Sequence, residues 1–324
     1  MAGDLLAYSI RKFFFSLVVL FFASVTIFTL VNLGYDPLAD LRQNPRISGE
    51  DIERIASIYG LDRPLHERYV IWITDFVTGD FGFSVNNQSP VVDLITPRIW
   101  PTVLLMGSSL IFTVIIAVPF GIYSAIKKYS ALDNVGTFFS FVGYSMPSFW
   151  LGLILQLVLG VYLTAWAGTR IFYTSGMSTL DGGFIDLLQH LTLPVITLSV
   201  IGIASYSRFQ RAAMLDVLSS DYLRTARAKG LSQRRVYLKH ALRNALIPVV
   251  TLIALEMGVL LGGAIITETV FAWPGLGFLL ADALYKGDYN TALALLMLTA
   301  VLVVFFNYVA DIVYSIVDPR ISYS

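Results

Sequence analysis

Glu256 is the side chain with the clearest potential for chemistry, because no other carboxylate lies so deep inside a long apolar stretch. An ionisable group at that depth is costly unless it is functional or paired. Glu256 could line a water-filled path and pair with the amino group of a cargo molecule. Alternatively, it could accept hydrogen bonds from Ser, Thr or Tyr of neighbouring helices. We expect the first role.

Most other chemistry is excluded by what the sequence lacks. There are no cysteines, so disulfides, thiolate metal ligands and a cysteine nucleophile are impossible. The three histidines, His66, His190 and His240, fall in separate segments, and we predict no metal site. No phosphate-cradling G-x-x-x-x-G-K-[ST] loop occurs, so any ATP and Mg would bind partner subunits. We expect no catalytic residues, no cofactor on this chain and no enzyme activity.

A basic segment, residues 208–244, is the second candidate site. Asp221 is a plausible N-cap and Gly230 a plausible C′ residue, which predicts a helix of about eight residues, or ~12 Å, between them. Ser232 is expected to cap the next helix. Small Ala226 and Ala228 among basic neighbours would let an acidic or polar groove approach closely. Alternatively, the segment only sets membrane topology, and the pattern alone leaves these two interpretations about even.

Long uncharged runs dominate the rest of the chain. Of the 324 residues, 56% are hydrophobic and 14% charged, whereas a soluble domain carries about 25% charged residues. Six runs can cross a bilayer, which predicts an all-α integral membrane protein. They are Phe13–Leu33, Trp100–Ile126, Val135–Gly168, Leu191–Ser207, Ala245–Thr267 and Thr291–Ala310. The first is too long for a signal peptide, and the third exceeds one crossing, so we expect it to be tilted.

Basic residues predict the orientation of these spans. Cytoplasmic loops are enriched in Lys and Arg, which places both termini in the cytoplasm. That choice leaves only Arg170 and Lys286 in the short external loops. The inner side then carries Arg11, Lys12, Lys127, Lys128, nine residues from Arg208 to Arg243, and Arg320.

The external segment between the first two spans, residues 34–99, is predicted to be partly helical. Ser48 can cap a helix that Gly60 would end, and a second helix is expected over residues 66–77. Together they would form a small cap packed on the spans. At the ends of the later spans, Glu268 and Asp311 are expected to reach interfacial water and to have structural roles.

Several ordered blocks resemble the permease subunits of ATP-binding-cassette importers in the dipeptide, oligopeptide and nickel subfamily. The first is Asp221-Tyr-Leu-Arg-Thr-Ala-Arg-Ala-Lys-Gly-Leu, continued by His240-Ala-Leu-Arg-Asn-Ala-Leu-Ile-Pro248. The general family pattern, Glu-Ala-Ala-x-x-x-Gly, is matched here by Arg224, Thr225, Ala226 and Gly230. Arg224 therefore replaces the leading Glu, as peptide-type members tolerate. Phe278 is a second departure, because an Arg is common there.

Further blocks of the resemblance are spread along the chain. They are Leu61-Asp-Arg-Pro-Leu, Gly79-Asp-Phe-Gly-Phe-Ser, Met146-Pro-Ser-Phe-Trp-Leu-Gly, Glu268-Thr-Val-Phe-Ala-Trp-Pro-Gly-Leu-Gly and Asp318-Pro-Arg. The resemblance implies a type I importer permease in the cytoplasmic membrane. It would comprise an N-terminal span with its external segment, residues 1–98, and a five-span core, residues 99–324.

The resemblance also implies a function and partners. The chain would take up di- or oligopeptides with a homologous second permease subunit, two ATPase subunits and an extracytoplasmic solute-binding protein. The ATPases would be engaged through Asp221, Tyr222, Arg224, Thr225, Ala226, Lys229 and Gly230. Two alternatives stay open: a permease for nickel or another small solute, and a secondary carrier that uses Glu256 as an ion or proton site. A carrier would be expected to contain internal repeats, and none is visible.

Overall fold

The computed structural model describes residues 2–34, 38, 42, 48–58, 60–84, 86–179, 182–253 and 264–317. These residues are mostly helical, which confirms the all-α prediction. The strands among them are β1, Phe83–Ser84, and β2, Ser89–Pro90. They form an antiparallel hairpin in which Phe83 faces Pro90 and Ser84 faces Ser89.

Five helical stretches of the described chain are long and apolar enough to cross a membrane. They lie in α1 (Ala2–Gly34), α5 (Val91–Ile126), Ser148–Ala167, α9 (Phe184–Leu218) and α16 (Tyr289–Val317). A sixth candidate is the pair Gln233–Ala245 and Ile247–Ile253, bent by 42°. The predicted fifth span, Ala245–Thr267, lies partly outside the described residues. α5 also runs continuously through residues 98 and 99, where we placed a domain boundary.

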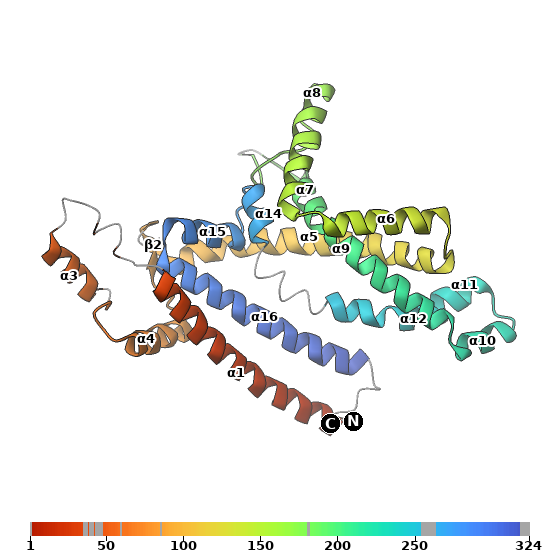
Figure 1. Cartoon of the computed structure of the whole chain (residues 1–324), viewed down its shortest axis with the longest axis horizontal. Helices are drawn as coiled ribbons and strands as arrows, with labels where there is room; N and C mark the ends of the chain where they lie inside the picture. Colours follow the sequence, from red (N-terminus) through yellow and green to blue (C-terminus); the bar gives the residue numbers. More distant parts are fainter. Residues whose placement is uncertain are drawn as a thin grey trace.

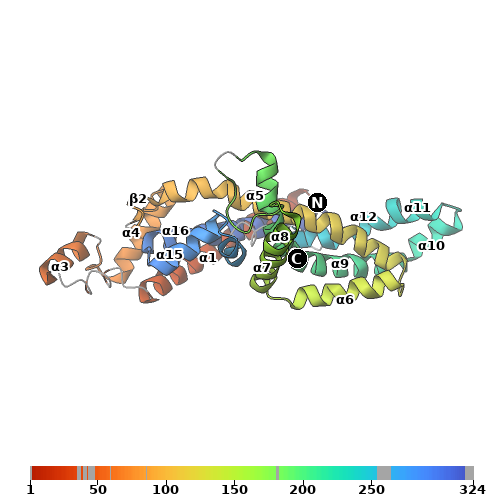
Figure 2. The same ribbon diagram turned by 90° about the horizontal axis from the view of Figure 1, so that it is seen from above.

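The prediction of one tilted span over Val135–Gly168 is wrong, because the chain turns sharply at Pro147. α6 (Ala131–Ser145) ends before Met146, whose backbone is extended, with φ −78° and ψ 129°. Steric conflict with a following proline ring disfavours helical geometry, so Pro147 stops α6. The next helix consists of α7 (Ser148–Leu155), the π-helical segment η1 (Gln156–Tyr162) and α8 (Leu163–Ala167). It projects away from α6 in both ribbon views (Figures 1 and 2).

The most extensive packing between described helices joins α5 and α9. Ala117 of α5 and Tyr206 of α9 are buried together with Val249 from the bent pair. Gly121 allows the two backbones to approach, because a Cβ there would lie 2.7 Å from the Ser207 carbonyl oxygen. Small residues commonly permit such close approach between membrane helices. This pair forms the centre of the structure.

α1 and α16 pack side by side in opposite directions. At one end, Lys12 of α1 pairs with Asp311 of α16 at 2.8 Å. At the other end, the Asn32 amide donates a hydrogen bond to the Tyr289 hydroxyl. The beginning of α1 therefore lies level with the later part of α16, as expected if both termini share one side of the membrane.

Two helices of the predicted external segment are present, α3 (Gly49–Ile58) and α4 (Leu65–Thr78). The Ser48 hydroxyl accepts the Asp51 backbone N–H at 3.1 Å, and Gly60 has a φ of 63°, so both predicted caps are confirmed. Figures 1 and 2 place α3 and α4 at one end of the long axis, and α10 (Asp221–Ala228) and α11 (Gln233–Arg235) at the other. The external and the basic segments therefore lie at opposite ends of the molecule.

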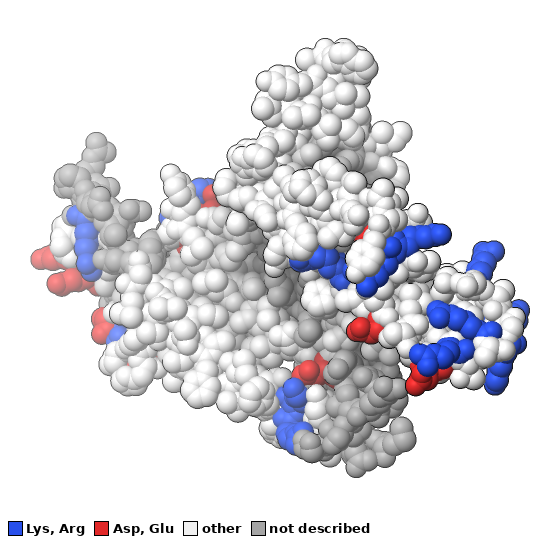
Figure 3. Space-filling model, turned by 45° about the vertical axis from the view of Figure 1, so that its right-hand side comes forward, with Lys and Arg blue, Asp and Glu red and all other residues white. Residues whose placement is uncertain are grey.

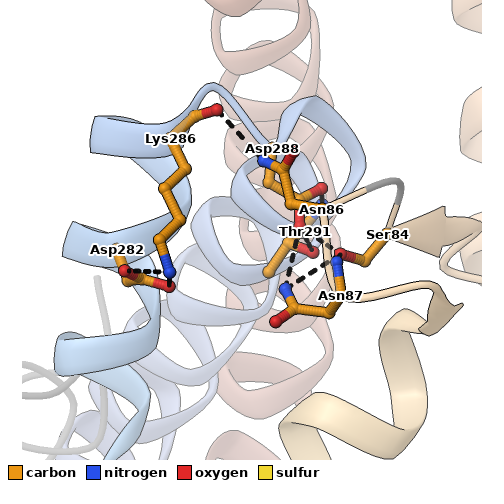
Figure 4. Close-up of polar contacts among 7 residues, drawn as sticks. All are labelled: Ser84, Asn86, Asn87, Asp282, Lys286, Asp288 and Thr291. Carbon is orange, nitrogen blue, oxygen red and sulfur yellow. Dashed lines mark hydrogen bonds and ion pairs between the residues drawn. The ribbon is translucent and has the colours of Figure 1, made fainter.

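A buried polar cluster ties the β1–β2 hairpin to the start of α16. Asp288 accepts hydrogen bonds from the hydroxyls of Ser84 and Thr291, the latter at 2.9 Å. The Ser84 hydroxyl in turn accepts the Asn87 amide at 3.0 Å (Figure 4). The Asn86 amide donates to the carbonyl of Lys286, the last residue of α15 (Leu276–Lys286), at 3.0 Å. These bonds fix the hairpin to the junction between α15 and α16.

Candidate functional site

The helix expected in the basic segment is α10, Asp221–Ala228. Its N-cap is Ser220 rather than Asp221, so that prediction is wrong by one residue. Ser220 has the extended backbone of a cap, with φ −70° and ψ 148°, and Asp221 is already helical. An acidic residue is favoured in the first turn by the partial positive charge of the helix N-terminus.

Gly230 confirms the predicted end of this helix. Its φ is 73°, in the left-handed region, and its backbone N–H bonds to the Arg227 carbonyl at 3.0 Å. A Cβ at this position would meet nothing within 4 Å. Glycine is therefore favoured here by backbone conformation and not by lack of space.

The inner face of α10 is anchored by two buried side chains, Leu223 and Ala226. They belong to an apolar cluster that draws on α5, α9 and the segment after α10, formed by α11 (Gln233–Arg235), η2 (Val236–Ala241) and α12 (Leu242–Ala245). The other members of the cluster are Ala125, Met214, Val236, Ala241 and Ala245. Because Ala226 points inward, our expectation that it lies on the outer contact face of the helix is wrong. Ala226 follows Leu223 by three positions, so both side chains lie on the same side of the helix.

A polar contact adds a second link between α10 and α12. The Asn244 side-chain amide donates to the Tyr222 hydroxyl at 2.8 Å. These residues are 22 positions apart, so local pattern could not reveal the bond. Through it, α10 is connected to the segment that leads into the predicted fifth span.

The outer face of α10 is polar, and basic side chains surround it (Figure 3). Of the predicted site residues, Asp221, Tyr222, Arg224, Thr225, Lys229 and Gly230 are exposed. Arg224 and Asp221 form an ion pair at 3.4 Å, but both side chains are highly exposed, so the pair adds little stability. Arg227, Arg234, Arg235 and Lys239 are exposed nearby. This surface suits a partner with acidic or polar groups.

A buried ion pair holds α6 to α9 near the same end. The Arg211 guanidinium donates two hydrogen bonds to Asp133, at 2.8 and 2.9 Å, and Asp133 is only 1% exposed. The bonds from Arg211 lower the pKa of Asp133 below its usual value. This pair was not predicted from the sequence. Its one local signal is the spacing of Ser130 and Asp133, since the Ser130 hydroxyl accepts the Asp133 backbone N–H at 3.2 Å.

The structure describes only one of the two acidic residues in and beside the predicted fifth span, Glu256 and Glu268. Glu256 lies outside the described residues. Glu268, in α14 (Ile265–Val270), is fully buried, so the prediction that it reaches interfacial water is wrong. Its carboxylate accepts the Thr102 hydroxyl at 3.0 Å and the Phe278 backbone N–H at 2.8 Å. These bonds join α14, α15 and α5, which agrees with a structural role.

The three histidines do not come together as a group of metal ligands. His190 stacks on Tyr173 with ring centroids 3.9 Å apart, and its Nδ1 lies 2.8 Å from the Asp186 carbonyl oxygen. Within the described part of the chain, no three His, Cys, Asp or Glu residues group closely enough to hold a metal. The candidate site is therefore the basic surface around α10.

Comparison with known proteins gives consistent results. Residues 117–323 match the family "Binding-protein-dependent transport system inner membrane component". The oligopeptide transport system permease AppB of Bacillus subtilis is 42% identical over 98% of this chain and 99% of its own. The dipeptide transport system permease DppB of Escherichia coli K12 is 37% identical, covering 94% and 96%. The glutathione transport system permease GsiC of the same strain is 38% identical, covering 98% and 100%.

A solved structure supports the fold. The methionine ABC transporter MetNI, in an inward-facing conformation, has a chain that superposes with a TM-score of 0.53. The match covers 69% of this chain and 96% of that chain, at 19% identity. The shared architecture is that of an ABC transporter permease.

Proposed function

Because the chain belongs to the family of binding-protein-dependent transport system inner membrane components, we propose that it is the permease subunit of an ABC importer for di- or oligopeptides. The observation that carries this proposal is the similarity over nearly the whole chain to permeases named for oligopeptide, dipeptide and glutathione transport. All three cargoes are peptides. Neither a secondary carrier nor a nickel permease receives comparable support.

The surface around α10 is where the chain would engage its ATPase subunits. Its helix is exposed on one side, and its other side packs on α5, α9 and α12 through the Leu223 cluster. Tyr222 is additionally held by Asn244. A displacement of α10 would therefore move several membrane helices together, as coupling requires. The seven predicted residues would have different roles. Ala226 packs the helix against the buried cluster, Gly230 ends the helix, and the exposed residues contact the partner.

The orientation follows from the same assignment. α10 and both termini face the cytoplasm, and α3, α4 and the β1–β2 hairpin face outside. The pairing of Lys12 with Asp311 supports termini on one side. Basic residues around α10 support the cytoplasmic position.

The cargo would cross the membrane between this chain and a homologous second permease subunit, after delivery by a solute-binding protein. Glu256 remains the candidate pathway residue, on the strength of its position in an apolar run. ATP and Mg would bind only the ATPase subunits, and this chain would have no catalytic activity of its own. Glu256→Gln should then alter the rate or preference of transport while the complex still assembles.

Co-expression followed by reconstitution tests the proposal. We expect the chain to co-purify with an ATPase subunit, and the complex in liposomes to accumulate a labelled di- or oligopeptide only with ATP and binding protein. The isolated chain should hydrolyse no ATP above background. Peptide uptake by the isolated chain, driven by an ion gradient, would support the carrier instead.

A further inference from the structure

Arg208 is the first charged residue after the uncharged run Leu191–Ser207 of α9. Long basic side chains at the end of a span usually extend away from the hydrocarbon, towards water and headgroups. The Arg208 side chain instead folds back along α9, and its Nε donates to the Ala204 carbonyl at 3.1 Å. Its guanidinium group lies 5.1 Å from the ring centroid of Phe141 and 4.8 Å from that of Tyr144, both on α6.

Two contacts between α6 and α9, which run antiparallel, fix the level of these rings. Arg211 binds Asp133 near the start of α6. Nearer its end, Gly143 lies against Val200, where a Cβ would be 2.9 Å from the valine Cγ1. Arg208 precedes Arg211 by three residues, so its backbone lies opposite the third residue after Asp133. The two rings belong to residues five and eight positions further along α6, roughly 8–12 Å towards Val200. Arg208 therefore extends towards the apolar run to reach them.

No acidic side chain in the described ranges forms an ion pair with Arg208. Asp133, the one acidic residue of α6, already accepts two hydrogen bonds from Arg211. A charge at this depth ordinarily faces the interior of a helix bundle or a water-filled path and pairs with an opposite charge there. The positive charge of Arg208 is therefore available to an anionic group from outside this chain.

An apolar hollow lies next to this charge, in the corner between α6 and α7. Its volume is about 620 Å³, and Phe141 lines it as well as contacting Arg208. The rest of its lining includes Val142, Ser145 and Trp150. Ligand sites commonly combine such an apolar surface with a few polar groups. A positive charge beside an apolar hollow suits a molecule that carries a carboxylate next to an apolar side chain.

We propose that Arg208 binds the terminal carboxylate of a peptide on its way to the cytoplasm, while the hollow beside Phe141 receives the neighbouring side chain of that peptide. Every linear peptide ends in a carboxylate, so one cation can serve many cargoes. The rings of Phe141 and Tyr144 orient the guanidinium group without neutralising its charge. A lipid phosphate is the other anion at a membrane surface, but it lies at the headgroup level, whereas Arg208 extends towards the apolar run. The inference rests on the proposed function, because the peptide supplies the carboxylate.

Thiol labelling tests whether the site is positive and accessible to water, because the native chain has no cysteine. Ser145→Cys, in the hollow, would be labelled in the complex with its ATPases, with and without ATP. An anionic and a cationic methanethiosulfonate reagent would be compared, each relative to its rate with a free thiol. We expect the anionic reagent to react several-fold faster, because Arg208 attracts it. Arg208→Gln should abolish this preference and Arg208→Lys should retain it.

Lys128→Gln is the matched control for this labelling. Lys128 also lies over an aromatic ring, that of Tyr129, at 4.7 Å, and its loss should leave the preference intact. An unchanged preference in Arg208→Gln would overturn the inference. Protection of Ser145→Cys from both reagents, with and without ATP, would also overturn it, because lipid or protein would then fill the hollow.

Import tests the carboxylate itself. Uptake of a labelled dipeptide and of its C-terminal amide would be compared in proteoliposomes for wild type, Arg208→Gln and Lys128→Gln. The binding protein is the same in all three, so a change in the acid-to-amide ratio reports on the permease. We expect a several-fold lower ratio in Arg208→Gln alone. An equal ratio in three active transporters refutes this inference alone, whereas wild type that imports neither peptide refutes the proposed function and this inference with it.

Discussion

α10 and α4 are both short helices that pack on membrane spans, but their outer faces differ. α10 is seated by the small aliphatic side chains Leu223 and Ala226 and presents charged groups outward. α4 packs through the rings of Tyr69, Trp72 and Phe76 and presents Val70 and Val77 outward together with the acidic Glu67. The comparison indicates that the surroundings of each helix follow from its outward-facing residues and not from the residues that pack against the spans. A charged face suits a protein partner in water.

Weakening the packing of α10 against the membrane spans should have the largest effect. Leu223→Ala would open a cavity in a fully buried cluster and cost about 2–5 kcal/mol. We expect loss of peptide import and weaker binding of the ATPase, measured in proteoliposomes and by co-purification. Arg224→Ala, one residue away and exposed, is the control and should leave folding unchanged. If Leu223→Ala transports normally, the packing of Leu223 in this cluster is not needed for coupling.

The ion pair that holds α6 to α9 should come next. Asp133→Asn replaces a carboxylate that accepts two bonds from Arg211, with a cost of about 1–3 kcal/mol in thermal stability. Because the pKa of Asp133 is lowered in the folded state, its contribution is present above the pKa of the unfolded carboxyl. It is lost as pH falls through the lower, folded value. Thermal unfolding of wild type and variant should therefore differ at neutral pH and converge on strong acidification.

Changing the end of α10 should separate hydrolysis from transport. Gly230→Val places a β-branched residue at a φ of 73°, a strain of roughly 1–3 kcal/mol, although its Cβ has space. The membrane spans should still fold, while substrate no longer stimulates ATP hydrolysis and import is lost. Gly230→Asn is the matched control, since Asn tolerates this conformation better. Normal stimulated hydrolysis and import in Gly230→Val would refute a coupling role for this helix end.

The smallest effect is expected where α4 meets α1. Tyr69→Phe removes one hydrogen bond, worth about 0.5–1.5 kcal/mol, and Ser24→Ala removes the same bond together with the bond from the Ser24 hydroxyl to the Phe21 carbonyl. In a double-mutant cycle the double variant should lose less than the sum of the two single losses, because both changes remove the bond between Tyr69 and Ser24. Additive shifts in the unfolding temperature would indicate that the two side chains do not interact.

Sequence reasoning succeeded where the signal was local. Gly230, Ser232 and Ser48 each mark a helix end through their own conformational preference or short-range bonds. The turn at Pro147 also had a local signal, but the continuous apolar run concealed it. Composition placed the spans that correspond to α1, α5, α9 and α16, because charge is excluded from hydrocarbon.

It failed where the partner lies far away in the chain. Glu268 was assigned to interfacial water, yet it is buried and accepts a hydrogen bond from Thr102, 166 residues earlier. The bonds of Tyr222 to Asn244 and of Tyr69 to Ser24 are likewise set by packing and not by nearby sequence. Such pairs have no fixed spacing, so no pattern along the chain could reveal them.

Cross-linking from α10 tests the central claim most directly. In a chain without other cysteines, Arg224→Cys would be cross-linked in the co-expressed complex with a short thiol-to-amine reagent, beside Val77→Cys on α4. We predict a product with an ATPase subunit from position 224 and none from position 77. Absence of an ATPase product from 224 in a complex that still hydrolyses ATP and imports peptide would contradict the assignment of α10 as the coupling surface.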